Sequence, residues 1–314
     1  NDVDMDDIIW MGPQPSIKDL AAQVGVQKTM PLSQLSVVVA TAISQGRKVH
    51  FLPPYRYDNM IWLEALTGIK ASLVKKYASI ELIKAVVDLR AVKEACEIIE
   101  LDLACNIGYE MHTAAMRLCK PGVSEQYIAG VLEGIAASYG SKTSFATILT
   151  QHGETLHNHD HSHTLEVGRM MLTDAGAERI SNYCSDHTRT VPVGGKFEGR
   201  QKDIYNIVLA CHDKALELTR PGITYKEVHL EVCKVLAQGL KDVGLMRGNV
   251  EDAVAAGAHA LFLPHGLGHM MGLDVHDMED LGQIYVGYDD ETRPSTQFGL
   301  ASLRMGRRLQ EGFV

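Results

Sequence analysis

Two aspartates, Asp174 and Asp186, stand in the segments MMLTDAGAE and NYCSDHTRTVPV, which have the alternating pattern of strands. Asp174 shares its alternation with Leu172, and Asp186 with Cys184, so each carboxylate is expected on the apolar side of its strand. If the strands form a hairpin that turns near Ile180, the two carboxylates face each other. Burying such a pair is costly unless a cation neutralises it, which indicates a metal site. Each aspartate taken singly could instead be a turn or capping residue.

Three histidines, His265, His269 and His276, lie in the segment PHGLGHMMGLDVHD. The glycines between them let the backbone and a substrate approach closely. Imidazole combined with carboxylate suits zinc, manganese, cobalt or iron rather than calcium, which prefers oxygen ligands alone. The segment HGLGH has glycine where HExxH has its glutamate, which excludes a zinc helix of that class. A single histidine is more often structural, but three so close together favour metal or proton chemistry.

Four further histidines alternate in the segment LHNHDHSH, at His157, His159, His161 and His163. On a strand they would share one face. The polar residues between them make an exposed loop the better interpretation. His157 follows the apolar Leu156 and is the best candidate for an inward role.

The aspartate segments require two strands, expected at Arg169–Ala175 and Ser181–Val191, with a short connection at 178–180. Shorter strand candidates lie at Ala260–Pro264 and Gly272–His276. Each group of strands follows helical segments, and an antiparallel sheet with helices outside it fits this order better than a parallel sheet with crossovers. The fold class expected for this part of the chain is α+β.

Two similar helix pairs are expected to support these strands. Residues 79–119 show an apolar period of three and four residues, and a Pro-Gly pair separates them from a second helix that begins after Ser124 and ends near residue 139. The segment KPGVS at 120–124 returns as RPGIT at 220–224, again between two helical runs. The region is therefore interpreted as an internal duplication.

Residues 1–78 have a different pattern. Short apolar runs at Ser36–Ala40 and Lys48–Leu52 lie between helical stretches broken by prolines, and short strands between helices predict an α/β unit. The chain begins without a methionine in what could be a strand-helix segment, so an upstream portion is expected to be absent. The domains expected are 1–78 and 79–314.

Composition narrows the kinds of partner that the protein can bind. The chain has 314 residues and is 46% hydrophobic, which is enough material for two domains. Its formal charge of −9 is unfavourable for binding nucleic acid or an anionic membrane. It contains no apolar run long enough to cross a membrane, and the first seven residues are acidic rather than signal-like, so a cytoplasmic protein is expected. Six cysteines without CxxC pairs predict reduced, mostly buried thiols.

The segments DAGAE, SDHTRT followed by VGGKF, and HGLGHMMGLDVHD resemble, in order and spacing, the metal and active-site blocks of the pita-bread metallopeptidases. Within that family the creatinase, aminopeptidase P and prolidase branch is the most similar, particularly its bacterial Xaa-Pro aminopeptidases. The likeness extends from about Leu82 to Val314, and residues 1–78 resemble the end of the family's amino-terminal domain. It implies a pita-bread catalytic domain, with duplicated helix pairs on an antiparallel sheet, after a partial α/β domain.

The resemblance implies a dinuclear metal centre. Asp174, Asp186 and His269 match its metal ligands, with Asp186 bridging two divalent ions, most often Mn²⁺ and otherwise Zn²⁺ or Co²⁺. The family completes this centre with two glutamates, which are expected just beyond Val314, because Glu311 comes too early to replace either. The chain as given is therefore expected to hold an empty or partly occupied site and to be inactive.

The resemblance also assigns roles to three histidines. His157 matches the histidine that assists at the scissile bond, while His265 and His276 match those that hold substrate and stabilise the tetrahedral intermediate. Met270 and Met271 stand where relatives often have an aromatic residue, so the pocket wall departs from the family pattern.

The reaction implied is hydrolysis of the Xaa-Pro bond of proline-containing peptides, which releases the residue before proline. A dipeptidase of the prolidase kind is the alternative, and an inactive module that binds peptides or proteins is a third. A homodimer is a candidate assembly because such relatives are commonly dimers. In the folded chain Asp174, Asp186 and His269 should converge on one concavity, with His265 and His276 lining it.

Overall fold

The computed structural model describes residues 3–314 and divides the chain into two units, the first ending at Ile83 and the second comprising Lys84–Val314. Helix α5 (Ile80–Ala91) spans this division. In the part of the chain that is described, none of the helices combines the length and the apolar character needed to cross a membrane. The assignment of residues 1–78 to a partial amino-terminal domain stays a prediction.

The first unit is built from short helices. They are α1 (Met5–Met11), α2 (Ile17–Gln23), the 3-10 turn η1 (Leu32–Gln34), α3 (Leu35–Ser44), α4 (Tyr57–Thr67) and the 3-10 turn η2 (Val74–Tyr77). Local signals fix their ends. The Ser16 hydroxyl accepts the N–H of Asp19 at the start of α2, and Gly68 ends α4 in the left-handed conformation.

The strands predicted at Ser36–Ala40 and Lys48–Leu52 are wrong. The first segment lies inside α3, and residues 47–55 have no regular secondary structure. The β preference of valine depends on a neighbouring strand, whereas a helix satisfies its own backbone. Val37 and Val38 remain exposed on α3, and residues 3–83 form no strand.

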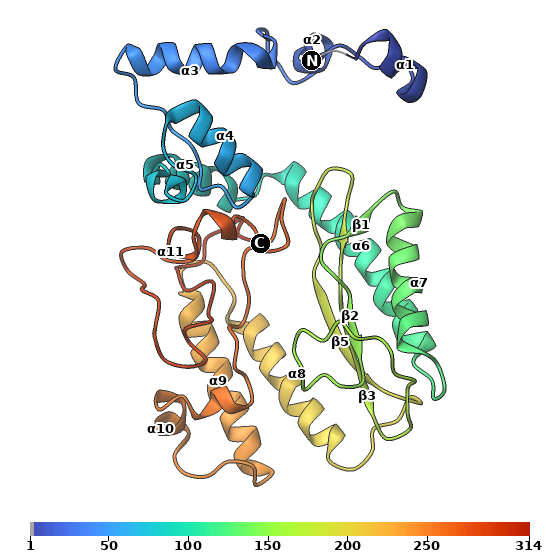
Figure 1. Cartoon of the computed structure of the whole chain (residues 1–314). Helices are drawn as coiled ribbons and strands as arrows, with labels where there is room; N and C mark the ends of the chain where they lie inside the picture. The colour runs from blue at the N-terminus through green and yellow to red at the C-terminus, as the bar shows by residue number, and fades with distance from the viewer. Residues whose placement is uncertain (1–2) are drawn as a thin grey trace. The chain divides into compact units, whose positions relative to one another are not determined.

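The second unit begins with a helix pair on a sheet (Figure 1). The helices are α6 (Ala95–Leu118) and α7 (Glu125–Ser138), and the sheet has the strands β2 (Ile148–Thr150), β3 (Met170–Ala175) and β5 (His187–Pro192). These strands are antiparallel in the order β2-β3-β5, and β1 (Lys142–Thr143) pairs separately with β4 (Ala177–Glu178). The helix pair on an antiparallel sheet confirms the predicted fold class.

The main hydrophobic core lies between this helix pair and the sheet. Its largest fully buried side chains come from both layers and are Met111, Ile128, Leu132, Leu149 and Met171. Burial of apolar surface contributes roughly 25 cal/mol per Å² removed from water, so the burial of this cluster is the main interaction that holds the helices on the sheet.

The long helical period at 79–119 forms two helices rather than one. The break falls at residues 92–94, where Glu94 caps α6 through a reciprocal hydrogen-bond pair with Glu97. Lys93 is buried at this break, and its ammonium group donates to Asp277 at 2.9 Å. The apolar period predicts one continuous helix here. The chain instead ends one helix and starts another, and the buried ammonium group of Lys93 lies between them.

The second half of this unit has a helix pair without the following sheet. Its elements are α8 (Gln201–Leu218), α9 (Tyr225–Asp242), α10 (Val250–Ala255), η3 (Ala258–Leu261), η4 (Glu279–Leu281) and α11 (Gln283–Val286). The strands predicted at Ala260–Pro264 and Gly272–His276 are wrong, because residues 257–314 form short helices, turns and an isolated bridge but no strand. These short apolar runs have no strand beside them to pair with.

The internal duplication is visible in matching backbone hydrogen bonds. The N–H of Gly122 donates to the carbonyl of Leu165, and the N–H of Gly222 donates to the carbonyl of Leu309, both at 2.9 Å. In each copy the leucine N–H donates in return to the residue after the glycine, again at 2.9 Å. Both glycines have positive φ, which only this residue type adopts readily. The KPGVS and RPGIT segments are therefore equivalent turns.

Candidate metal centre

The hairpin of β3 and β5 positions the two aspartates. Asp174 pairs with Thr188 in the ladder, and Asp186 immediately precedes β5, so the carboxylates are diagonal rather than directly opposite neighbours. The chain turns through Arg179 to Tyr183, where the N–H of Arg179 donates to the carbonyl of Tyr183 at 3.0 Å. The predicted hairpin is confirmed, although its second regular strand starts at residue 187 and not at 181.

Asp174 lies on the face of β3 opposite to the one predicted. Met171, Thr173 and Ala175 are buried towards the helices, whereas Asp174 and Leu172 are on the alternate, half-buried face. Apolar residues occur on both faces of this strand, so alternation alone does not identify the core side. The carboxylate is therefore on the face of the sheet that the helix pair leaves free.

Asp174 and Asp186 repel each other. Burial and the neighbouring charge of Asp186 raise the pKa of Asp174 to about 6, against a smaller lowering by a hydrogen bond with Thr188. The Oδ1 atom of Asp174 is buried without a hydrogen-bond partner. A buried carboxylate oxygen without a partner, next to a second carboxylate, is a position that a cation would stabilise.

Two histidines from the segment HGLGHMMGLDVHD, His269 and His276, lie next to Asp186. The Nε2 atom of His269 is 3.2 Å from Oδ2 of Asp186, and the ring of His276 packs edge-on against that of His269 with centroids 4.3 Å apart. One ligand atom from each of these three residues lies within 4.8 Å of the others, and all three side chains are half-buried. Asp186 and His269 thus converge with His276 beside them, and Asp174 is close enough for both of them to influence its pKa. The role of Asp174, Asp186 and His269 as metal ligands stays a prediction.

The pKa values of the two histidines move in opposite directions. Burial acts to lower the pKa of His269, but the hydrogen bonds with Asp186 and the Met270 backbone, together with the negative charge of Asp186, outweigh it, so the pKa is raised. The pKa of His276 is lowered, first by burial and then by the positive charges of His269 and Arg304. The lowered pKa favours the neutral imidazole of His276, which is the form that binds metal.

Arg304 fixes the orientation of His276. Its guanidinium contacts Nδ1 of His276 and donates to Oε2 of Glu279 at 2.7 Å. Glu279 also lies 2.8 Å from the same Nδ1, and the tautomer of the imidazole decides which of the two residues is its hydrogen-bond partner.

A buried ion pair anchors the loop that carries both histidines. Asp277 accepts from Lys93 at 2.9 Å and from Arg90 at 2.6 Å, and its own N–H donates to the carbonyl of Met270 at 2.9 Å. A side chain at position 272 would collide with the Asp277 carboxylate, which explains the glycine there. Sequence reasoning missed Lys93, Arg90 and Arg304, although an aspartate directly after His276 was a usable signal for Asp277.

The other two predicted histidines lie outside this cluster. His265 is exposed, and its Nδ1 lies 2.8 Å from the carbonyl of Gly266, so it does not line the small hollow next to His269. His157 is exposed in a turn rather than directed inward. His159 and His161 lie within reach of backbone carbonyls of the β2 segment, in agreement with a loop packed on the sheet edge. The catalytic roles assigned to His157 and His265 stay predictions.

The sequence profile of metallopeptidase family M24 matches residues 100–314. The chain belongs to metallopeptidase family M24. The family assignment covers both halves of the second unit, including the metal-centre residues, and confirms the resemblance seen in the three sequence blocks. Family M24 enzymes use divalent metal ions, so a metal centre is expected in this member.

Proteins similar to this chain include Xaa-Pro aminopeptidases. The chain is 32% identical over 283 residues to the Xaa-Pro aminopeptidase of Escherichia coli, covering 88% of this chain and 64% of the relative. It resembles proline aminopeptidase P II from Yersinia pestis with a TM-score of 0.79 and 29% identity, over 100% of this chain and 69% of that one. Aminopeptidase PepP of Pseudomonas aeruginosa matches with a TM-score of 0.81 and 25% identity, over 100% of this chain and 68% of that one. The pita-bread fold is thereby confirmed.

Proposed function

We propose that this protein is a metal-dependent Xaa-Pro aminopeptidase, which hydrolyses the bond between an N-terminal residue and a following proline. The observation that carries the proposal is the meeting of Asp174, Asp186, His269 and His276 at the end of the β3–β5 hairpin in a chain of family M24. Relatives named for this activity support it. The chain spans 64% of the length of the Escherichia coli relative, so the activity is proposed for the full-length protein.

Two divalent ions are the proposed cofactors, Mn²⁺ first, with Zn²⁺ or Co²⁺ as alternatives. Asp174, Asp186 and His269 would hold them, and the buried, unpartnered Oδ1 of Asp174 fits a cation. The donor set of carboxylate oxygen and imidazole suits Mn²⁺, Zn²⁺ and Co²⁺. When bound, such ions supply Lewis-acid activation of water and of the scissile carbonyl.

The reaction adds water across the amide bond. The water oxygen bonds to the carbonyl carbon, the bond from that carbon to the proline nitrogen breaks, and the nitrogen takes up a proton. We assign to His276, whose Nδ1 contacts Arg304, the donation of a hydrogen bond from Nε2 to the carbonyl oxygen as negative charge develops there. Removing one such donor typically costs about 2.7–4 kcal/mol of transition-state stabilisation.

We assign substrate contacts to His157 and His265. Both are exposed and therefore accessible to a peptide. A homodimer is part of the same proposal and rests on the family resemblance alone. A cytoplasmic location is proposed with it.

Substrate kinetics test the reaction. Full-length protein loaded with Mn²⁺ should have a higher kcat/KM on a Xaa-Pro-Yaa-Yaa tetrapeptide than on a Xaa-Pro dipeptide, with release of the first residue measured by chromatography. Preference for the dipeptide would identify a prolidase-type dipeptidase instead. No hydrolysis of either peptide, together with tight peptide binding, would identify a binding module.

A charge-removing substitution tests the centre. Asp186→Asn should lower kcat at least about a thousandfold, because several kcal/mol of charge stabilisation by the metal ions depends on this carboxylate. Asp102→Asn makes the same chemical change on the exposed face of α6 and should leave kcat unaltered. Equal activities of the two variants would show that Asp186 is not part of the centre.

A further inference from the structure

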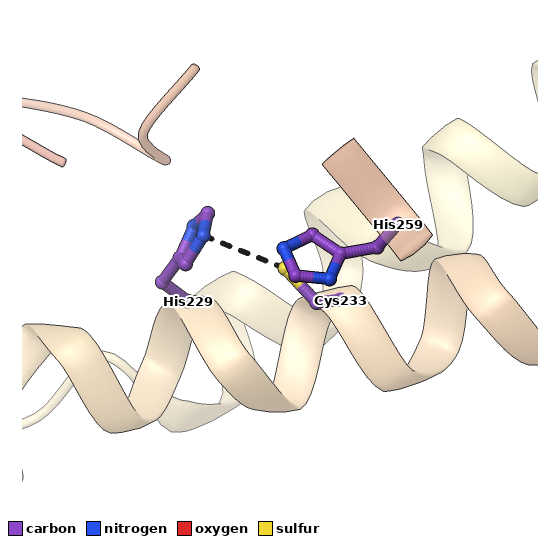
Figure 2. A group of neighbouring side chains, drawn as sticks. All are labelled: His229, Cys233 and His259. Carbon is purple, nitrogen blue, oxygen red and sulfur yellow. Dashed lines mark hydrogen bonds between the residues drawn. The ribbon is translucent and has the colours of Figure 1, made fainter. Parts of the chain in front are cut away.

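A second group of metal-ligand side chains lies in the other half of the same unit (Figure 2). His229 and Cys233 are on α9 and His259 is on η3, and each is 0% exposed. One ligand atom from each of the three lies within 4.8 Å of the others. None of the three has a part in the proposed peptidase mechanism.

The local fold brings these residues together without strain. His229 and Cys233 are four residues apart, so they share one face of α9. The left-handed Gly257 starts η3, which places His259 over that face, as Figure 2 shows. Apolar side chains of α9, α10 and the following loop surround the sulfur, among them Ala237 and Val254.

The hydrogen bonding of this group is incomplete. The thiol of Cys233 lies 3.5 Å from Nε2 of His229, which pairs those two groups. Nδ1 of His229 and both ring nitrogens of His259 are buried without a hydrogen-bond partner. Burial lowers the pKa of His259, and the nearby backbone of Val254 opposes this only in part. Buried polar atoms are nearly always paired, so three orphaned nitrogens around one thiol need an explanation.

A catalytic thiol does not explain the group. Cys233 is fully buried, and burial raises its pKa to about 12, so it is not a nucleophile open to a substrate. Burial and the neighbouring His259 lower the pKa of His229 to about 4, which keeps its imidazole neutral. A neutral imidazole is the form that binds metal.

We propose that His229, Cys233 and His259 form a second metal site that takes a thiophilic divalent ion of the zinc class. For zinc at about 2.3 Å from sulfur and 2.0–2.1 Å from nitrogen, tetrahedral geometry sets the sulfur and nitrogen about 3.5 Å apart. The separation between Cys233 and His229 is 3.5 Å. Binding forms the metal–sulfur bond and releases the thiol proton to solvent, so the thiolate is created by the metal.

The two centres of the molecule would then select different ions. The carboxylate-rich centre at Asp174 and Asp186 suits Mn²⁺, whereas a thiolate with two imidazoles prefers zinc. The second site would also tie α9 to η3, four residues before the HGLGH segment that carries His269. Its role is therefore structural support of the loop that completes the first centre.

Cobalt is a probe for the sulfur ligand. Chelator-stripped full-length protein reconstituted with Co²⁺ should show a thiolate-to-cobalt charge-transfer absorption, and Cys233→Ala should lose this band and one equivalent of cobalt per chain. Cys211→Ala, which removes a buried thiol between α8 and α9, should keep both. Cys184, near Asp186 in the chain, is unchanged in the two variants. Absence of the band from the wild type, or its survival in Cys233→Ala, overturns the proposal.

A measurement on the wild type avoids any folding defect of the variants. Protein saturated with Mn²⁺ and given one equivalent of Zn²⁺ should show, in zinc-edge X-ray absorption, one sulfur neighbour at about 2.3 Å and nitrogens at about 2.0–2.1 Å. A zinc shell of oxygen and nitrogen alone would place the ion at the carboxylate centre and contradict the second site. Neither result depends on peptidase activity.

Discussion

The two halves of the unit Lys84–Val314 begin alike and end differently. Each starts with a helix pair, α6 with α7 and α8 with α9, and each closes its Pro-Gly turn with the same two hydrogen bonds to a distant leucine. The first half then forms β3, which carries Asp174, and β5, which Asp186 immediately precedes. In the second half, residues 257–314 form no strand.

This difference shows two ways of positioning a functional side chain. In the first half the backbone ladder of β3, paired on both sides, fixes Asp174. In the second half the loop with His269 and His276 is held by side-chain charges, above all the contact of Lys93 with Asp277. We therefore expect the second half to respond more strongly to the loss of a single charge.

Removal of the buried cation is expected to have the largest effect on stability. Lys93→Met should lower the free energy of unfolding by about 3–5 kcal/mol, because it leaves the buried carboxylate of Asp277 with only the partial compensation of Arg90. Urea titration followed by fluorescence measures the change. Hydrogen exchange should show the main loss of protection in residues 257–314 and little in β3.

Two further variants control this comparison. Lys120→Met changes an exposed lysine in the first half and should shift the free energy of unfolding by less than about 0.5 kcal/mol. The double variant Lys93→Met with Asp277→Leu should recover much of the loss, because no unpaired charge remains. A double variant as unstable as Lys93→Met would mean that the loop is held by packing rather than by charge.

The halves also differ in how far the sequence predicts them. The hairpin is readable because alternation and turn residues are local signals, but the face of Asp174 is not, since both Met171 and Leu172 are apolar and only the position of the helices decides. The contact of Lys93 with Asp277 joins residues 184 positions apart. No local pattern encodes such a pair. Without it, the apolar runs at 260–264 and 272–276 have only their composition to indicate a structure, and that composition favours strands.

In metal-free protein, the repulsion between Asp174 and Asp186 in the first half should be measurable as a pH dependence of the free energy of unfolding. The pKa of Asp174 is about 6 in the folded chain and roughly 3.9 in an unfolded one, so its favourable contribution is present below about pH 4 and lost as the pH rises through 6. Asp174→Asn does not titrate. It should be more stable than the wild type above pH 6, by up to about 3 kcal/mol, and equal to it near pH 4.

The matched measurement is the same pH series with saturating Mn²⁺. Bound metal stabilises only a chain that can hold it, so the order of the two proteins should reverse at neutral pH. A destabilised Asp174→Asn without metal at pH 8 would contradict close contact between the two carboxylates.

The smallest effects test whether the halves truly begin alike. Ser124→Ala and Thr224→Ala remove the N-cap hydroxyls of α7 and α9, which accept the N–H groups of Tyr127 and Glu227. Each should cost about 1 kcal/mol of unfolding free energy, measured by urea titration. Thr224→Ala should be the costlier by a few tenths, because a capping box exists only at α9 of these two helices.

A hydroxyl at the other end of a helix serves as the control for both substitutions. Ser138→Ala removes a hydroxyl from the last turn of α7, where it donates to the carbonyl of Ile135 and caps no N–H group, so its cost should be near zero. Equal losses for Ser138→Ala and Ser124→Ala would remove the capping explanation. A loss at α9 several times that at α7 would mean that the second half depends on its first turn to hold the strandless segment, and that the duplicated starts are equivalent in geometry but not in energy.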